Sequence, residues 1–508
     1  MRSFLFSKVT QAKYKTLSSQ AKNQSEINQF VISFLSSIQI FFAQFKHIPM
    51  TKHSHLLKPI QNLVFINPVK FKYIRSQDVL LVCETIRLLY VYYENIHIGT
   101  IHRDNELNST FTYSSTWLKY SKNFALILSM PLQKETFGNK ITLSYFENLL
   151  PEGKIRDVLE KNYHAKGTFN FLNEFGSDCA GVIVISDKQK IEESVRLRPE
   201  KSIDLRTIFK AIEENSTIAD TIAQMDHGYL SIAGAQDKFV AIYRDQKFYL
   251  PASGEPSTHI IKIPINRSGV KDSVYNEYYC MQLAKTIGLN TAHCFIVEPP
   301  QTPLFVTERY DRKITQNKKI YKIHQQDFCQ AQGYVSEFKY EEKGGPTLSD
   351  NFNLIKNNVA IKIRSQNLFS YLDWICFNLL IGNNDSHSKN LSLLMIDQKV
   401  QLAPFYDMLC TAIYPQLKNN FSFKIGDRDH FSKIRFNQFT QTEEKLDIKK
   451  GTFINRMHSV IELIHQHKDS VAETIINQHP RAKIALRISK LIDDRIKGLK
   501  QQGLNFKK

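Results

Sequence analysis

The strongest constraint in this sequence is a polar segment enclosed between two apolar elements. Residues 366–381 have the spacing of an apolar helix that ends at Gly382, and residues 391–396 predict an apolar strand. Between them, residues 383–390 read NNDSHSKN. This order predicts a polar loop that joins a helix to a strand, and its residue types indicate chemistry.

Two residues of this loop have a spacing found in one class of enzymes. Asp385 and Asn390 stand five positions apart, like the Asp and Asn in the catalytic loop of protein kinases. There the Asp orients a hydroxyl nucleophile and accepts its proton, while the Asn carbonyl binds magnesium. Asp407 follows Asn390 by 17 positions, after a second short strand predicted over residues 401–406. It can be the other metal ligand, because Mg²⁺ favours few carboxylates together with nucleotide phosphates.

Upstream, residues 231–238 read SIAGAQDK and precede a strand predicted over residues 239–243. Small residues let backbone N–H groups approach an anion closely, so this segment is a candidate phosphate-binding loop. It matches neither the Walker pattern nor G-x-G-x-x-G, so a plain hairpin turn is the alternative.

A lysine and a glutamate follow in the same order as in a kinase. Lys262 lies in an alternating stretch at residues 258–263, where a half-buried ammonium needs an anionic partner unless it reaches solvent at a sheet edge. Glu277 lies on a helix predicted over residues 272–287, with Asp272 as its capping acid. Glu277 can pair with Lys262, as in the strand-lysine to helix-glutamate pair of kinases, or face solvent.

Each site residue also has a purely structural interpretation. Asp385 and Asn390 can shape an Asx-turn, Asp407 can cap the next segment, and His387 can be a hydrogen-bonded loop residue. The combined order favours catalysis: small-residue loop, strand Lys, helix Glu, D-x-x-x-x-N loop, hairpin and Asp.

The region before this site predicts a mixed α+β unit. Residues 88–93 and 96–101 alternate as a hairpin, and residues 111–117 and 125–131 are predicted as further strands. Helices are expected over the remaining apolar-periodic stretches, residues 145–150 and 155–163.

The net charge of +18 is concentrated at the two ends of the chain. Residues 1–78 hold 11 Lys or Arg against 2 acids, and residues 424–508 hold 18 against 10. Basic ends can bind nucleic acid or simply solvate the chain. The apolar run at residues 30–45 is short for a membrane span, so an amphipathic or buried helix is expected there, unless translation starts at Met50.

Seven cysteines lie far apart, without a C-x-x-C pair or a His at zinc spacing. This pattern favours a reducing, cytoplasmic compartment. Cys83, Cys280 and Cys376 fall in apolar stretches, where a free cysteine is usually a small buried hydrophobe.

With these residues in view, the sequence resembles the HipA family of bacterial serine/threonine kinase toxins over about residues 86–480. Asp237 stands where the family loop commonly has Glu, and the first 85 residues lie outside the family core. The stretches that carry the resemblance are ENLLPEG at 147–153, GSDCAG at 176–181, SIAGAQDK at 231–238, THIIKIP at 258–264, NEYYCMQLAKTIGL at 276–289, TERYDR at 307–312, HQQDFCQAQG at 324–333, GGP at 344–346, LLIGNNDSHSKNLSLL at 379–394 and LAPFYDM at 402–408.

The resemblance implies a HipA-like protein kinase fold of the α+β class, with a β-rich N-terminal part and a mainly helical C-terminal lobe. It implies four parts: a basic extension at 1–85, an α+β subdomain at 86–190, a kinase N-lobe at 191–311 and a helical C-lobe at 312–508.

It also implies roles for particular residues. Asp385 would be the catalytic base, Asn390 and Asp407 would bind Mg²⁺, and Ser231 would be the autophosphorylated serine that switches the kinase off, with Ser253 or Ser257 next in line. The residues expected to bind ATP are Ala233, Gly234, Ala235, Gln236, Lys238, Lys262, Glu308, Arg309, Tyr310, His387 and Lys389, of which 308–310 would form the hinge that meets adenine.

The partners implied are a helix-turn-helix antitoxin, through which the chain would meet operator DNA indirectly, and a protein substrate, glutamyl-tRNA synthetase being one known in the family. No membrane association is expected. Two other functions remain open from the sequence: a catalytically silent kinase fold that acts as a co-repressor module, and a kinase for a small molecule.

Overall fold

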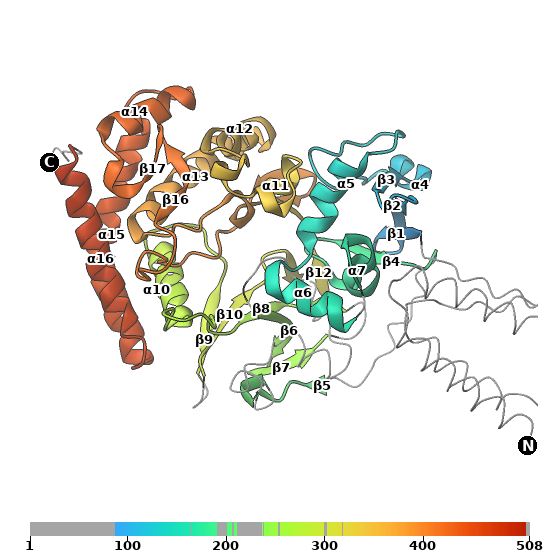
Figure 1. The fold of residues 1–508 in the computed structure, drawn as a ribbon, viewed down its shortest axis with the longest axis horizontal. Coiled ribbons are helices and arrows are strands. Elements are labelled where there is room, and N and C mark those ends of the chain that lie inside the picture. The colour runs from blue at the N-terminus through green and yellow to red at the C-terminus, as the bar shows by residue number, and fades with distance from the viewer. Residues whose placement is uncertain are drawn as a thin grey trace, which may run out of the picture. The chain divides into compact units, whose positions relative to one another are not determined.

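The computed structural model describes residues 87–163, 165–189, 201–205, 208–210, 236, 238–251, 255–298, 302–316 and 319–503. The chain divides into two compact units, Met1–Ile86 and Arg87–Lys508, and every described residue belongs to the second (Figure 1). The apolar run at 30–45, Met50 and Cys83 therefore lie outside the described residues.

The second unit begins with a four-stranded antiparallel sheet in the order β3-β2-β1-β4. The predicted hairpin is confirmed, because β1 (Leu88–Tyr93) pairs with β2 (Ile96–Arg103) through a tight turn. The sheet is completed by β3 (Ser109–Tyr113) and by β4 (Ile183–Ser186), which returns from 90 residues downstream to pair with β1.

Of the two further strand predictions in this subdomain, one is right only in part and the other is wrong. The stretch at 111–117 is a strand only as far as Tyr113, because Ser114 accepts a hydrogen bond from the Trp117 N–H at 3.0 Å and starts helix α4 (Ser115–Lys119). Residues 125–131 form turns around a single bridge between Ile127 and Met130.

Besides α4, this subdomain contains helices α5, α6 and α7. The helix predicted over 155–163 is observed as α6, whereas the stretch predicted over 145–150 contains the end of α5 and a 3₁₀ turn at Glu147–Leu149. Helix α5 contacts β3 and helix α7 contacts β4, and each of the three helices has a buried apolar residue, namely Phe146, Leu159 and Phe171. Their bounds are Asn139–Phe146, Gly153–Asn162 and Thr168–Phe175.

The next part of the unit is a six-stranded antiparallel sheet in the order β5-β7-β6-β8-β10-β9. Helix α10 (Ser273–Thr286) packs on β9 and β10, and ten of its 14 residues are buried. The strands are β5 (Lys201–Ser202), β6 (Lys238–Arg244), β7 (Lys247–Leu250), β8 (His259–Lys262), β9 (Cys294–Val297) and β10 (Leu304–Glu308).

Helix α10 begins at the predicted position, but Asp272 does not cap it as predicted. Asp272 occupies the N-cap position but has a left-handed backbone with φ of 58°, and its side chain makes no capping hydrogen bond. Ser273 instead accepts a hydrogen bond from the Ile265 N–H at 2.8 Å.

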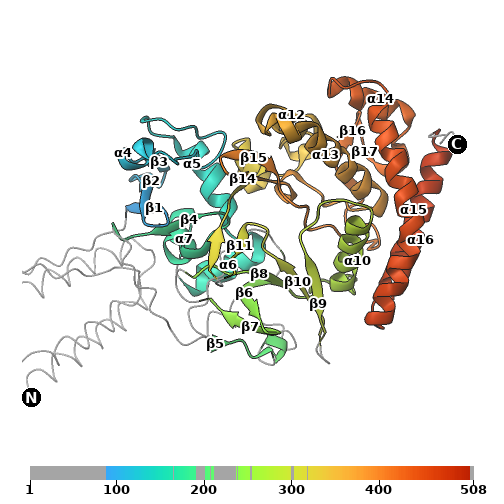
Figure 2. The same ribbon diagram turned by 180° about the vertical axis from the view of Figure 1, so that it is seen from behind.

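The C-lobe is mainly helical and contains most of the largest core cluster. Helix α13 packs on α15 and α16, which lie side by side along the edge of this lobe in both views (Figures 1 and 2). The helices are α11 (Phe328–Ala331), α12 (Leu348–Asn358), α13 (Ile361–Ile381), α14 (Phe436–Lys445), α15 (Thr452–Gln478) and α16 (Ile484–Gln501).

Short antiparallel pairs complete the C-lobe. β14 lies between β13 and β15 in a three-stranded sheet beside the polar loop. β15 ends at Leu402, earlier than the predicted 401–406, because Pro404 has no N–H for the ladder. The strands are β11 (Arg312–Ile314), β12 (Ile320–Lys322), β13 (His324–Asp327), β14 (Ser392–Ile396), β15 (Lys399–Leu402), β16 (Asn420–Ile425) and β17 (Arg428–His430).

Within the described residues, no helix combines the length and the hydropathy that a membrane crossing requires. The cysteines at 280 and 376 are buried free thiols, as predicted.

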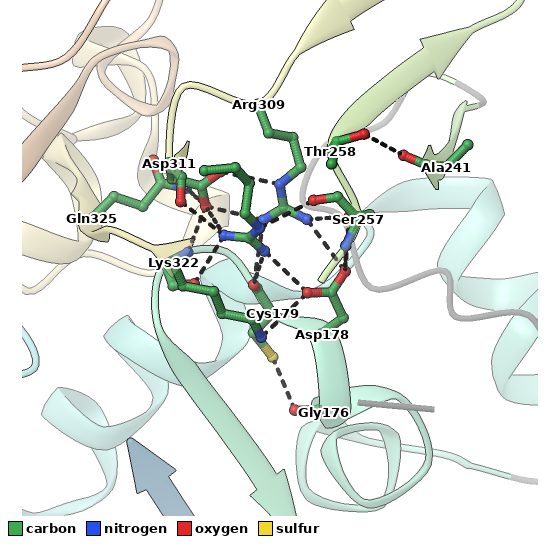
Figure 3. A network of polar contacts seen from close by, with 12 residues as sticks. Gly176, Asp178, Cys179, Ala241, Ser257, Thr258, Arg309, Asp311, Lys322 and Gln325 are labelled. Atoms are coloured by element: carbon green, nitrogen blue, oxygen red, sulfur yellow. Dashed lines mark hydrogen bonds and ion pairs between the residues drawn. The ribbon is translucent and has the colours of Figure 1, made fainter. Parts of the chain in front are cut away.

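A buried cluster of charges fastens the N-terminal subdomain to the end of β10 (Figure 3). Asp178 accepts from Arg312 at 3.0 Å, lies 3.5 Å from Arg309 and lies 3.3 Å from Lys322. Asp311 pairs with the two arginines at 3.0 and 2.8 Å. Although burial opposes ionisation, Arg309, Lys322 and Arg312 hold the pKa of Asp178 well below its ordinary value.

We expect the substitution Asp178→Ala to lower the free energy of unfolding by about 3 to 5 kcal/mol, because it leaves three buried cations with one carboxylate. Urea denaturation measures this. The control is Asp157→Ala on an exposed face of α6, which should change stability by less than about 0.5 kcal/mol. Equal effects of the two substitutions would contradict the prediction.

Candidate active site

The polar loop after α13 is held rigidly by its own side chains. The helix ends at Gly382, whose φ is 73°, and an added Cβ there would come within 2.7 Å of the Ala412 Cβ. Asn383 donates to Asn378 Oδ1 at 2.8 Å, and its own Oδ1 accepts from the Asp385 N–H at 3.2 Å. Asn390 donates to the backbone carbonyl of Asp385 at 3.0 Å. The two ends of the D-x-x-x-x-N stretch are therefore in direct contact.

Lys262 is the centre of the site. Its ammonium group lies 2.6 Å from Glu277 on α10 and 2.5 Å from Asp407, which follows the β14–β15 hairpin. Burial alone would lower the pKa of Lys262, but the two carboxylates raise it well above its ordinary value. The predicted Lys262–Glu277 pair is thus present, and the structure adds Asp407 to it.

Asp407 has an unusual backbone conformation and two lysines close to its carboxylate. Its φ of 59° is in the left-handed region, which a non-glycine residue rarely adopts and which is concentrated at functional sites. Although burial opposes its ionisation, Lys262 and Lys238 hold its pKa well below the usual range. Asp407 is therefore an anion, and its side chain is still 32% exposed.

Two residues of the small-residue segment, Gln236 and Lys238, are described. Lys238 on β6 is paired in register with Lys262 on β8, and burial and the neighbouring ammonium lower its pKa to about 8. Gln236 donates to the Ile263 carbonyl at 3.2 Å. Ser231, Ala233, Gly234 and Ala235 lie outside the described residues.

Asp385 is engaged by an aromatic residue. The Tyr340 hydroxyl donates to Asp385 Oδ1. The ring of His387 lies edge-on to Tyr340, with 5.0 Å between the centroids. Burial lowers the pKa of His387 to about 4, despite the charges of Asp385 and Asp407 nearby, so its imidazole is neutral at pH 7.

The expected hinge is divided between three environments. Glu308 is exposed and pairs with His293 at 3.0 Å. The Arg309 side chain points into the buried cluster of Figure 3. Tyr310 stacks on Tyr406, with 5.5 Å between the ring centroids, directly before Asp407.

Comparison with known proteins agrees with this geometry. The protein-family model described as HipA-like C-terminal domain matches residues 230–473. The family model described as HipA N-terminal domain matches residues 89–186. The putative kinase Y4mE of Sinorhizobium fredii is 34% identical over 352 residues, which cover 68% of this chain and 82% of that protein. The chain belongs to the HipA family.

Two further HipA-family matches extend this result. The serine/threonine-protein kinase toxin HipA of Shewanella oneidensis is 28% identical over 407 residues, 76% of this chain and 90% of that protein. The solved complex of Shewanella oneidensis HipA with HipB and operator DNA matches with a TM-score of 0.70 at 24% identity, over 81% of this chain and 97% of that one. The resemblance and the α+β kinase fold predicted from the sequence are confirmed, and the chain is a HipA-family protein kinase.

The sequence analysis assigned no role to three residues near the polar loop at 383–390: Glu152, Lys339 and Tyr340. Lys389 pairs with Glu152 at 2.5 Å, and Lys339 pairs with the same carboxylate at 2.8 Å. Glu152 belongs to the stretch ENLLPEG, which carried the family resemblance, so the sequence signal for it was present. Lys339 and Tyr340 precede GGP at 344–346, another such stretch.

The oxygen-bearing side chains of this HipA-family site, those of Asn390 and Asp407, suit a Mg²⁺ ion that binds as a complex with a nucleotide. Within the described ranges, no group of three or more His, Cys, Asp or Glu side chains could bind a metal by itself. A cation held by Asn390 and Asp407 would need phosphate or water oxygens to complete its shell, as Mg²⁺ in kinases does. Lys262 and Lys238 lie beside Asp407 and are suited to anionic phosphates.

Proposed function

We propose that this chain is an ATP- and Mg²⁺-dependent serine/threonine kinase that acts as the toxin of a type II toxin–antitoxin system. The observation that carries the proposal is the buried Lys262, held between Glu277 and Asp407 beside the Asp385–Asn390 loop. The two carboxylates keep the buried Lys262 charged, and a buried charged lysine is suited to bind an anionic phosphate.

Each residue has a defined task in this proposal. Lys262 and Lys238 bind the ATP phosphates, and Asn390 and Asp407 are the Mg²⁺ ligands. Bound Mg²⁺ supplies neutralisation of phosphate charge. Asp385 orients the substrate hydroxyl and accepts its proton as the oxygen bonds to the γ-phosphorus and ADP leaves.

Tyr340 must yield to the substrate in this reaction. Its hydroxyl donates to the Asp385 oxygen that a serine hydroxyl would approach. Burial and the charge of Asp385 raise the pKa of Tyr340 well above its ordinary value, so it remains a donor. A substrate hydroxyl can therefore replace one neutral donor by another without leaving Asp385 unpaired.

The partners follow from the family. The solved Shewanella oneidensis relative is a complex with HipB and operator DNA, which supports a DNA-binding antitoxin as the partner of this chain. We propose contact with DNA only through that antitoxin, action in the cytoplasm, and an aminoacyl-tRNA synthetase, of the glutamyl type by resemblance, as the substrate.

Replacing Asp385 by Asn should reduce phosphoryl transfer by several orders of magnitude, because it removes the proton acceptor. The assay is transfer from labelled ATP with Mg²⁺ to glutamyl-tRNA synthetase and to the chain itself. Asp494→Asn, on an exposed position of α16, is the control and should retain wild-type transfer. Transfer by Asp385→Asn at the wild-type rate would refute the assignment of Asp385 as the catalytic base. Transfer by the wild type only to small molecules would show that the substrate is not a protein.

The affinity for MgATP should be constant at low pH and should fall above pH 8. The pKa of Lys238 in the free protein is about 8, so its charge is present below that pH and is lost above it. We expect a loss of about tenfold per pH unit above the pKa. Calorimetric titration from pH 6.5 to 9.5 measures it. Lys238→Arg keeps its charge and should flatten the profile; an unchanged slope would contradict the role of Lys238.

The substitution Ser231→Ala should abolish self-phosphorylation while leaving transfer to another protein intact. Mass spectrometry after incubation with MgATP measures this. The structure removes one fallback site, because Ser257 is fully buried and donates to Asp178 at 2.8 Å. Unchanged self-labelling would therefore move the switch to Ser253.

A further inference from the structure

We propose that Glu152, which belongs to the N-terminal subdomain, is a positioning residue of the active site that orders the catalytic loop through Lys389 and Lys339. The proposal rests on the proposed kinase function and extends it. In this proposal the N-terminal subdomain is attached to the rest of the unit and also contributes, through Glu152, to the order of the active site.

One carboxylate holds two lysines from different segments. Glu152 Oε1 accepts from Lys389 at 2.5 Å, and Oε2 accepts from Lys339 at 2.8 Å. The three side chains are only 13%, 5% and 16% exposed. In the part of the chain that the structure describes, neither lysine has another ion-pair partner, so Glu152 supplies their local counter-charge.

Both lysines are next to groups of the catalytic loop. Lys389 directly precedes Asn390 and lies four positions after Asp385. Lys339 directly precedes Tyr340, whose hydroxyl donates to Asp385. The backbone carbonyl of Lys339 also accepts from the N–H of Ser388, at 3.4 Å. Glu152 therefore connects the two segments that enclose Asp385.

The local structure presents Glu152 to these lysines. It occupies the N-cap position of α6, where an acid ordinarily accepts from the first turn, yet its side chain makes no capping bond. The segment before it is tied to the C-lobe, since Asn148 donates to the Tyr334 carbonyl at 2.8 Å and Gln330 donates to the Tyr145 carbonyl at 3.0 Å. The Glu152 carboxylate therefore pairs with Lys389 and Lys339 and does not cap its own helix.

The electrostatics of Glu152 favour a stable contact with Lys389 and Lys339. Burial opposes ionisation of Glu152, but Lys389 and Lys339 hold its pKa below the ordinary value. Without this carboxylate, Lys339 and Lys389 would lose their direct ion-pair partner and keep only the more distant charges of Asp385, Asp407 and Asp327, which is unfavourable for buried ammonium groups. Loss of Glu152 should therefore release Lys389 toward solvent and loosen the loop that carries it.

The test compares Glu152→Gln with Glu160→Gln in the full chain. Glu160 lies on the same helix α6, is 21% exposed and pairs with Arg156 at 3.0 Å, within the N-terminal subdomain. We expect Glu152→Gln to lower kcat by about 10- to 100-fold, the scale of a displaced catalytic group, with the affinity for MgADP unchanged. Glu160→Gln should retain the wild-type kcat.

A double variant tests whether Glu152 acts through Lys389. If it does, Glu152→Gln should cost little further kcat in a Lys389→Met background, because the group that it positions is already absent. Independent, multiplying losses would overturn the proposal, as would equal losses from Glu152→Gln and Glu160→Gln.

Amide hydrogen exchange provides a readout that does not need activity. Exchange of residues 383–391 should quicken in Glu152→Gln and stay at the wild-type rate in Glu160→Gln. Should Glu152→Gln fail to fold, Lys339→Gln removes one of the same two ion pairs and must quicken exchange in that segment; wild-type exchange would overturn the proposal. If the wild type transfers no phosphate, the proposed function fails, while the exchange result still decides the role of Glu152.

Discussion

The structure depends on one buried cation shared by two carboxylates. Lys262 on β8 meets Glu277 on α10 and Asp407 after the β14–β15 hairpin, at 2.6 and 2.5 Å. A buried ammonium is tolerated only when its charge is compensated in this way, so the sheet, the helix and the hairpin can close around it in one arrangement. The same arrangement places the lysine that we propose to bind phosphate beside the carboxylate that we propose to bind Mg²⁺.

Charge also joins the N-terminal subdomain to the rest of the unit, at two separate places. Asp178 lies among Arg309, Arg312 and Lys322 at the end of β10, and Glu152 holds Lys389 beside the catalytic loop. Charge-assisted hydrogen bonds have a preferred geometry, so they fix the relative position of two segments more narrowly than apolar contacts do. The first place fastens the subdomain near the expected hinge, and the second connects it to the residue before Asn390.

The elements predicted correctly were those with a strong local period. The hairpin of β1 and β2, helix α10 and helix α13 each show their apolar spacing within one segment. The errors arose where a single residue overrode that spacing. Ser114 caps a helix where 111–117 suggested strand, and Pro404 ends β15 before the predicted residue 406.

The sequence by itself determined the family, the α+β kinase fold and the D-x-x-x-x-N loop, because the spacing of Asp385 and Asn390 is local and survives in the folded chain. The order of lysine, glutamate and aspartate suggested a common site but not its contacts. Only the tertiary structure decided that Asp407 shares Lys262 with Glu277, and that Glu152 reaches Lys389 across 237 residues. No periodicity encodes contacts at that separation, since they depend on how whole subdomains pack.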